Sequence, residues 1–366
     1  MAGQVFFNNG INLSSGGNFL INGLITQIIN QTNLGFEYAG YKEKMVFTYR
    51  QALSKDEKFT QLTGPVEIDL INENGVKPEG ERNKMPDKGY AINEYGEKFT
   101  TSYLMYQWLQ KSQSLSGASS DVLSEWRQFA QDVRYLIIGG QMTTTQQMIY
   151  LWVKGLDPIS AVFWPWSPTP KGKPLFSQSH TARNGALTFA NVAPTNVVLS
   201  AVNLQFALDT LKTTVKLDNG YKVPNEDNRY ILYVPRNLEV TARIILNAQG
   251  NQVNNLSGTG TNAAQMNQFS FNGNVIELCV LNMLGDLDKN GNPIGLPTTW
   301  FLVNPYFIRL AEAFKYIELY GPQIKNYMNN ETDAYIVDIR MDFAVDHYGA
   351  EPWIFGSKGD GTPSNP

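Results

Sequence analysis

Apolar residues recur at helical spacing in three parts of the chain. In residues 121–138 they follow a four-three-four-three pattern and form one stripe along a helix: Val122, Trp126, Phe129, Val133 and Leu136. Ser120 or Asp121 can cap this helix, Gly139 and Gly140 are expected to interrupt it, and a second helical stretch follows at about 144–153. Two later helices are predicted to begin at Ser200, with Leu204, Leu208, Leu211 and Val215 on one face, and at Asn237, with Leu238, Ala242, Ile245 and Leu246.

Strands are predicted where apolar and polar residues alternate or where an apolar run is short. Residues 335–345 alternate almost perfectly over eleven positions, which is about twice the usual strand length. Pro235 ends a short apolar strand at residues 230–234, and residues 275–281 are expected to form a strand that is buried on both faces. The second half of the chain therefore mixes helices with strands.

A projecting hairpin is predicted in the first third of the chain. Residues 66–71 alternate between apolar and acidic residues, and a second extended stretch follows at residues 90–101. The intervening residues, 72–88, are rich in glycine, proline and charge. Two strands joined by such a tip form a hairpin that is only marginally stable unless it packs against something else.

Four other segments have the composition of connections. Residues 1–44 combine many glycines and asparagines with isolated apolar anchors, which predicts an extended arm that docks on another surface. Residues 158–174 form a connector rich in proline and tryptophan. Residues 247–268 are predicted to be a polar surface loop, and residues 356–366 a short tail of glycine, serine and proline.

The composition suits a protein with extensive contacts. Only 17% of the residues are charged, below the roughly 25% of an average soluble chain, and amides and hydroxyls take their place. Because ionised groups are costly to desolvate, such a surface favours large interfaces. The net charge of −4 and the lack of a long basic run argue against a dedicated nucleic-acid binder.

Cysteine usage and the distribution of apolar runs exclude further classes. Cys279 is the only cysteine, so no intrachain disulfide can form, and its apolar neighbours predict a buried, inert thiol. The first residues lack a basic segment followed by an apolar core, so no secretory targeting is expected. No apolar run approaches the roughly 18 residues that a membrane span needs.

No pattern predicts catalysis, a cofactor or a metal site. His180 and His347 lie far apart without metal ligands at the right spacing, which favours structural or surface roles. Asp286, Asp288, Asn290 and Gly291 match the first half of a calcium loop, but Pro297 stands where that loop needs a bidentate glutamate, so a plain turn is favoured. Trp164 and Trp166 can stack on a sugar or a base, although tryptophans among prolines more often pin a connector to a core.

A set of short motifs lies between residues 172 and 242. It comprises Gly172, Pro174, Leu175, Phe176, Ser177 and His180, then Leu199 and Ser200 at a helix start, then Pro235, Leu238, Glu239 and Ala242 in a strand–helix unit. These motifs resemble those of the major head subunit of Mu-like phages, and the ending around Asp346, His347, Gly349 and Pro352 is also similar. The order of segments agrees over most of the chain.

The resemblance implies an α+β protein with the Hong Kong 97-type phage capsid fold and no enzymatic activity or cofactor. The implied divisions are an N-terminal arm (1–44), an E-loop hairpin region (45–110), a first part of the P-domain with a long spine helix (111–198), an A-domain (199–302), and P-domain return strands with the C-terminal tail (303–366). An E-loop lies against a neighbouring subunit, so the charges at its tip are the candidate assembly interface: Lys77, Glu79, Glu81, Arg82, Lys84 and Asp87.

The implied function is that of a major capsid protein, whose pentamers and hexamers enclose double-stranded DNA in an icosahedral virion shell. The implied partners are further copies of the chain, a portal protein, a separate scaffolding protein, a cement protein as a further candidate, and non-specifically bound DNA, with assembly in the bacterial cytoplasm and no membrane. Two alternatives stay open at this point. Particles with protein cargo would favour an encapsulin-like compartment shell, and calcium-dependent melting of a monomer would favour a calcium-binding or enzymatic domain.

Overall fold

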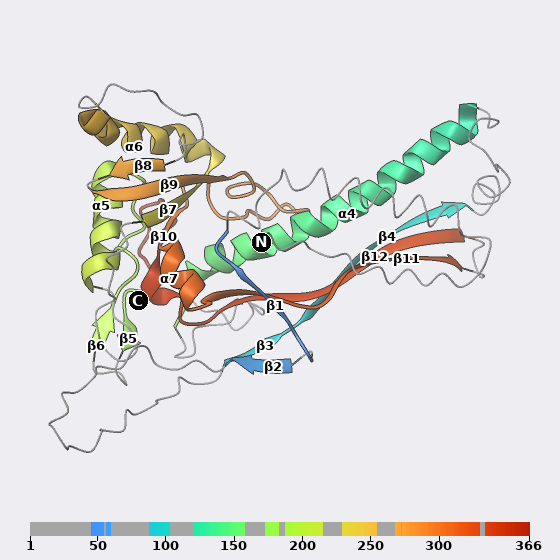
Figure 1. The fold of residues 1–366 in the computed structure, drawn as a ribbon, viewed down its shortest axis with the longest axis horizontal. Helices are drawn as coiled ribbons and strands as arrows, with labels where there is room; N and C mark the ends of the chain where they lie inside the picture. Colours follow the sequence, from blue (N-terminus) through green and yellow to red (C-terminus); the bar gives the residue numbers. More distant parts are fainter. Residues whose placement is uncertain are drawn as a thin grey trace, which may run out of the picture.

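The computed structural model describes residues 45–54, 56–59, 88–102, 120–157, 173–182, 187–214, 229–254, 268–271, 273–329 and 334–366. They form an elongated α+β molecule, with a long arm at one end and a compact unit of sheet and helices at the other (Figure 1). The predicted arm at 1–44, the strand at 66–71, the hairpin tip up to residue 87, and Trp164 and Trp166 lie outside the described residues.

The long arm at one end of the molecule is a different feature from the predicted N-terminal arm. It is built on two long antiparallel strands, β11 (Phe314–Asn329) and β12 (Ala334–His347). On the other side of β12 lies β4 (Asn93–Ser102), and β1 (Thr48–Gln51) runs parallel to β11, which gives the order β1-β11-β12-β4. The strand predicted at 335–345 is confirmed. The stretch predicted at 90–101 is also extended, and it is divided between β3 (Lys88–Ala91) and β4.

Helix α4 (Ser120–Gly155) lies along one face of this sheet as a single helix of 36 residues. The interruption predicted at Gly139 and Gly140 is therefore wrong. A Cβ atom added at Gly140 would lie 3.1 Å from Met341 Sδ and 3.4 Å from Ile339 Cδ1, so the missing side chain lets the helix approach β12 closely. This packing offsets the low helix propensity of the glycine pair.

The compact unit contains a five-stranded sheet in the order β13-β10-β7-β9-β8. Its strands are β7 (Arg229–Pro235), β8 (Gln268–Phe271), β9 (Asn274–Leu281), β10 (Trp300–Val303) and β13 (Ile354–Ser357). β7 and β9 are parallel, and α6 (Glu239–Asn254) lies between them in sequence. β10, β13 and β7 beyond Arg229 are buried throughout, so the apolar run predicted at 230–234 is a central strand.

Helices α5 and α6 of this unit begin in different ways, one at a side-chain cap and the other after a 3-10 turn. At α5 (Ala201–Asp209) the Ser200 Oγ accepts a hydrogen bond from the Asn203 backbone N–H at 3.2 Å, as a cap should, and a π-helical turn (Thr210–Thr214) extends the helix. Leu204, Leu208 and Leu211 are buried, which confirms the predicted face. Before α6, a 3-10 turn (Arg236–Leu238) follows the extended Pro235, so Asn237 lies inside that turn and the predicted Asn237 cap is wrong.

Two further expectations are corrected, and the predicted C-terminal tail is described. Helix α6 continues to Asn254 and contacts β8, so residues 247–254 of the loop predicted at 247–268 are helical. In β9, Val275 is 39% exposed and Glu277 is also exposed, because one face of the sheet is uncovered there. The tail predicted at residues 356–366 is partly buried, since Ser357 and Asn365 are largely inaccessible to solvent.

Trp152, close to the end of α4, joins the two parts of the molecule. Its side chain is fully buried. The Trp152 ring centroid lies 4.9 Å from that of Tyr233 in β7, 5.5 Å from that of Phe301 in β10, and 5.5 Å from that of Phe314 in β11. One side chain therefore contacts both sheets, and the arm and the compact unit share one hydrophobic core.

Candidate assembly surfaces

The base of the predicted hairpin is described, although its tip is not. The six candidate interface residues, Lys77, Glu79, Glu81, Arg82, Lys84 and Asp87, lie outside the described residues. On either side of them, β2 (Asp56–Phe59) pairs antiparallel with β3, so the chain enters and leaves the segment 60–87 at neighbouring positions. Tyr90 is buried against Ile317, Ala344 and Tyr348, which fastens this base to the arm sheet.

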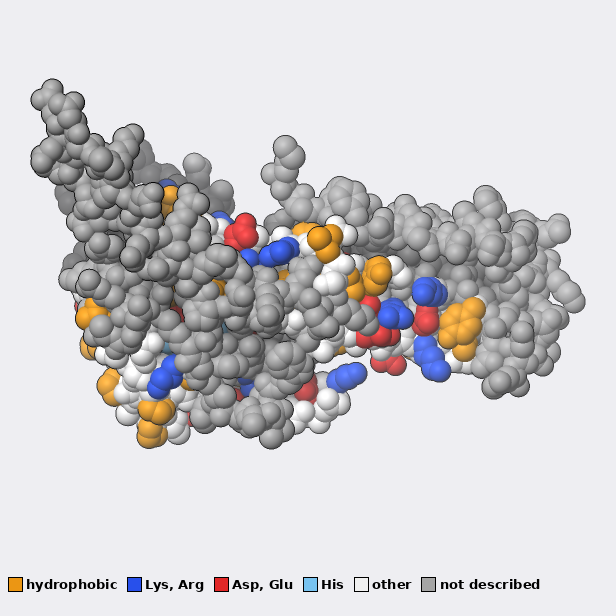
Figure 2. All heavy atoms as spheres, turned by 90° about the horizontal axis from the view of Figure 1, so that it is seen from below, with side chains coloured by type: hydrophobic (Ala, Val, Ile, Leu, Met, Phe, Trp, Pro, Cys, Tyr) orange, Lys and Arg blue, Asp and Glu red, His pale blue; other side chains and the backbone are white. Residues whose placement is uncertain are grey.

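The face of the arm that carries this base is the one turned away from α4. Ile339 and Met341 of β12 face α4 at Gly140, so alternate residues such as Arg340 and Ala344 face the opposite way. The Arg340 guanidinium lies 2.9 Å from a Glu94 carboxylate oxygen and 3.4 Å from one of Asp342. Basic and acidic side chains sit next to one another on this narrow part of the molecule (Figure 2). The Arg340–Glu94 pair is exposed on both sides and adds little stability to a subunit, whereas Asp342 is buried.

The motif around His180 organises buried backbone. His180 Nε2 lies 3.2 Å from the Leu175 carbonyl oxygen and 3.1 Å from Asn191 Oδ1. The Asn191 side-chain amide donates to the carbonyls of Leu175, at 2.9 Å, and Glu351, at 3.2 Å, while its Oδ1 accepts from the Ser177 backbone N–H at 3.0 Å. His180 and Asn191 are both buried, so their role is structural.

The same segment holds the C-terminal residues in place. The Ser177 hydroxyl donates to the Pro366 carbonyl at 2.7 Å, and the Asn365 side chain donates to the Phe176 carbonyl at 3.1 Å. The Gln178 backbone N–H donates to the Asn365 carbonyl at 2.9 Å. The motif that resembles those of phage head subunits therefore packs together segments that are distant in the chain. The order of residues along the chain does not reveal these contacts.

Replacing Asn191 with leucine, which has a similar size, is expected to lower the free energy of unfolding of the subunit by about 3 kcal/mol or more. The substitution leaves buried backbone groups without partners, and each such group costs about 1–3 kcal/mol. Urea unfolding of unassembled subunits measures the change. Asn203→Leu is the matched control, because the Asn203 side chain donates a single exposed hydrogen bond among the described residues, to the Val198 carbonyl. Equal losses in the two variants would contradict the assignment.

The segment with calcium-loop character forms a closed turn. One Asp288 carboxylate oxygen accepts the backbone N–H groups of Asn290 and Asn292, both at 2.8 Å. The other accepts the Tyr150 hydroxyl of α4 at 2.9 Å and the Asn292 side chain at 3.2 Å. Partial desolvation acts in the opposite direction, but the hydrogen bonds from Asn292, Tyr150 and Asn290 lower the pKa of Asp288. Burial and the contact with Asp288 raise the pKa of Tyr150 to about 12.

Calcium is expected to leave this turn unchanged, because the Asp288 carboxylate is already occupied by four donors and the position of the missing glutamate holds Pro297. Isothermal calorimetry of the subunit with calcium chloride measures this. Asp288→Ala should lower the melting temperature equally with and without calcium. A micromolar calcium site that the substitution abolishes would overturn the prediction.

The other residues considered for chemistry are placed in the interior. Cys279 is buried, as predicted, and so are both histidines, His180 and His347. Among the described residues, no three or more histidine, cysteine, aspartate or glutamate side chains are grouped so that they could hold a metal ion. No described helix is both long and apolar enough to cross a membrane.

Comparison with known proteins identifies the class. Solved structures similar to this chain include the capsid of Ralstonia phage GP4 (11% identity, TM-score 0.45, 88% of each chain covered), the capsid of the cyanophage P-SCSP1u (11%, 0.46, 86% of each), and the mature capsid of bacteriophage PhiM1 (13%, 0.42, 84% of this chain and 83% of that chain). No curated protein matches the sequence. Residues 169–352, about half of the chain, match the family model described as phage capsid protein.

The chain belongs to the phage capsid protein family. It is a major capsid protein, a structural subunit of the shell of a virion. The resemblance to phage head subunits and the α+β capsid fold are thus confirmed, and neither the encapsulin-like alternative nor the calcium-binding one is favoured. The six charged residues of the hairpin tip remain a prediction.

Proposed function

We propose that this capsid protein assembles as pentamers and hexamers that tile an icosahedral shell around double-stranded DNA, and that it has no catalytic role. The observation that carries the proposal is the family match over residues 169–352. The elongated shape supports it, because a closed shell needs two or more distinct contact surfaces on each subunit. Several modest contacts per subunit then add up to a stable particle.

We assign the elements of the structure to the domains that the resemblance to phage head subunits implies. Residues 199–302 would form the A-domain; three of the five strands of the compact sheet lie in that range, and a fourth, β10, ends one residue beyond it. Residues 111–198 and 303–366 would form the P-domain, to which α4, β11 and β12 contribute. β13, at residues 354–357, returns to the sheet of the A-domain range and so connects the two. Residues 45–110 would provide the E-loop, whose tip charges contact a neighbouring subunit.

The proposed partners are a portal protein, a scaffolding protein and a cement protein, with assembly in the cytoplasm of the bacterial host. DNA would contact the inner face non-specifically. The net charge of −4 supports weak contact, because strong binding to DNA requires many phosphate contacts from lysine and arginine.

Expression of the chain alone, followed by light scattering and negative-stain microscopy, tests the proposal. Pentamers, hexamers, tubes or closed shells are expected at modest protein concentration. A strictly monomeric protein over a wide concentration range would overturn self-assembly. Particles that enclose protein cargo would instead indicate an encapsulin-like shell.

A further inference from the structure

An open groove lies on one face of the five-stranded sheet. Helix α5 covers the other face, since the ring of Phe206 in α5 packs edge-on against that of Phe355 in β13, with 6.2 Å between the ring centroids. Across the sheet, Phe355 is in register with Leu302 of β10, Leu302 with Leu232 of β7, and Leu232 with Leu278 of β9. These side chains therefore lie on the face that α5 covers. Because side chains alternate along a strand, Arg229, Val275 and Glu277 point to the face opposite α5.

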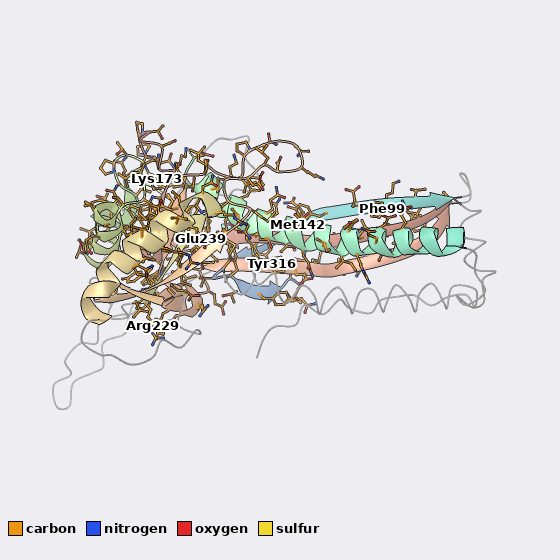
Figure 3. All side chains as sticks on the ribbon, turned by 90° about the horizontal axis from the view of Figure 1, so that it is seen from above. Phe99, Met142, Lys173, Arg229, Glu239 and Tyr316 are labelled. Carbon is orange, nitrogen blue, oxygen red and sulfur yellow. The ribbon has the colours of Figure 1, made fainter. Side chains whose placement is uncertain are left out.

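The groove has a volume of about 480 Å³ and lies between the first residues of β7 and β9 and helix α7 (Pro305–Leu310). Its main lining side chains are Arg229, Val275, Glu277, Tyr306, Arg309 and Leu310. Three of these are apolar side chains that remain accessible: Val275 is 39% exposed, Tyr306 54% and Leu310 69%. Figure 3 shows Arg229 at the margin of the compact unit, on the side away from Lys173.

The side chains of the two arginines are exposed, and their guanidinium groups have no ion pair or hydrogen bond within the described part of the chain. Elsewhere in that part, by contrast, Arg243 pairs with Glu239, and Arg340 with Glu94 and Asp342. The groove is therefore a local positive site on a chain whose net charge is −4. Tyrosine and arginine beside an apolar floor are the residues that most often dominate binding at protein interfaces.

We propose that this groove binds a short segment of another protein, in which carboxylates flank one large apolar side chain. The apolar side chain would cover Val275, Tyr306 and Leu310, and the carboxylates would pair with Arg229 and Arg309. Glu277 lies in the same groove and would repel phosphates and carboxylates alike, so the apolar lining residues, and not the charges, favour a peptide over nucleic acid. One part of the inference rests on the proposed function, namely that the partner is an accessory protein of the shell.

Fluorescence anisotropy tests the groove with a fluorescein-labelled probe peptide, Gly-Glu-Asp-Phe-Leu-Glu-Asp-Gly, and unassembled subunits. The peptide is expected to bind wild-type protein, and the double variant Arg229→Glu/Arg309→Glu should weaken its affinity at least about tenfold. Leu310→Ser should weaken it as well. Arg236→Glu is the matched control, because Arg236 is an exposed arginine of the same unit outside the groove. A peptide with lysine at every acidic position should not bind.

The other outcomes overturn the proposal. These are no binding by the acidic peptide, equal binding of the lysine peptide, or affinity that the double variant leaves unchanged. A labelled 20-base-pair DNA duplex that binds through the same arginines would assign the groove to nucleic acid. Loss of shells in the double variant by electron microscopy would assign it to a contact between copies. If wild-type protein forms no shells, the proposed self-assembly is contradicted. Peptide binding to the subunit still tests whether the groove is a binding site.

Discussion

Replacing residues 76–87 with a short glycine-serine turn is expected to leave the subunit folded and to abolish shell formation. The replaced segment contains two prolines and six charged residues, so it can add little to a hydrophobic core. Its base remains fastened by the pairing of β2 with β3 and by the burial of Tyr90. Circular dichroism should therefore stay native while negative-stain microscopy shows no closed particles.

The single substitution Arg82→Glu should have the same effect in weaker form, because a reversed charge would face like charges across a subunit contact. Lys289→Glu serves as its control, since Lys289 is an exposed residue of the Asp288 turn, far from the hairpin in sequence. Normal shells from the shortened variant would show that the hairpin tip takes no part in assembly. Loss of the native circular dichroism spectrum would instead place the segment in the core.

Replacing Trp152 with alanine is expected to lower the free energy of unfolding by about 3–5 kcal/mol, the range for a fully buried aromatic side chain. The cavity would open between α4 and both sheets, because the Trp152 ring packs against Tyr233, Phe301 and Phe314. Urea unfolding of unassembled subunits measures the loss, and shells should form poorly because the arm and the compact unit no longer hold a fixed angle.

Tyr135→Ala is the matched control, because Tyr135 lies on the same helix and is 54% exposed. Surface substitutions of this kind usually change stability by no more than about 0.5 kcal/mol. Similar losses at the two positions would show that Trp152 is not the junction between the two parts. A loss confined to Trp152 would identify that residue as the side chain that joins them.

Some features of the candidate assembly surfaces could be predicted from the sequence, whereas the groove could not. The low charge and the charged segment at 72–88 indicated a protein with extensive contacts, and the motif around His180 resembled those of phage head subunits. The groove beside α7 was missed, because Tyr306 and Leu310 look like core residues in a short apolar segment. What distinguishes them is their exposure beside Arg229 and Arg309, whose guanidinium groups have no partner among the described residues.

The sequence by itself determined the local elements. The strands at 230–234 and 335–345, the buried face of α5 and its Ser200 cap follow from the periods of strand and helix and from the unpaired amides at a helix start. Such patterns show which face of an element is buried, but not which distant residues cover it. Tertiary structure therefore decided that α4 continues through Gly139 and Gly140, the second of which packs against β12, and that Asn191 and Trp152 join segments far apart in the chain. These outcomes depend on close packing between residues separated by up to about 200 positions, and a local pattern carries no information about such contacts.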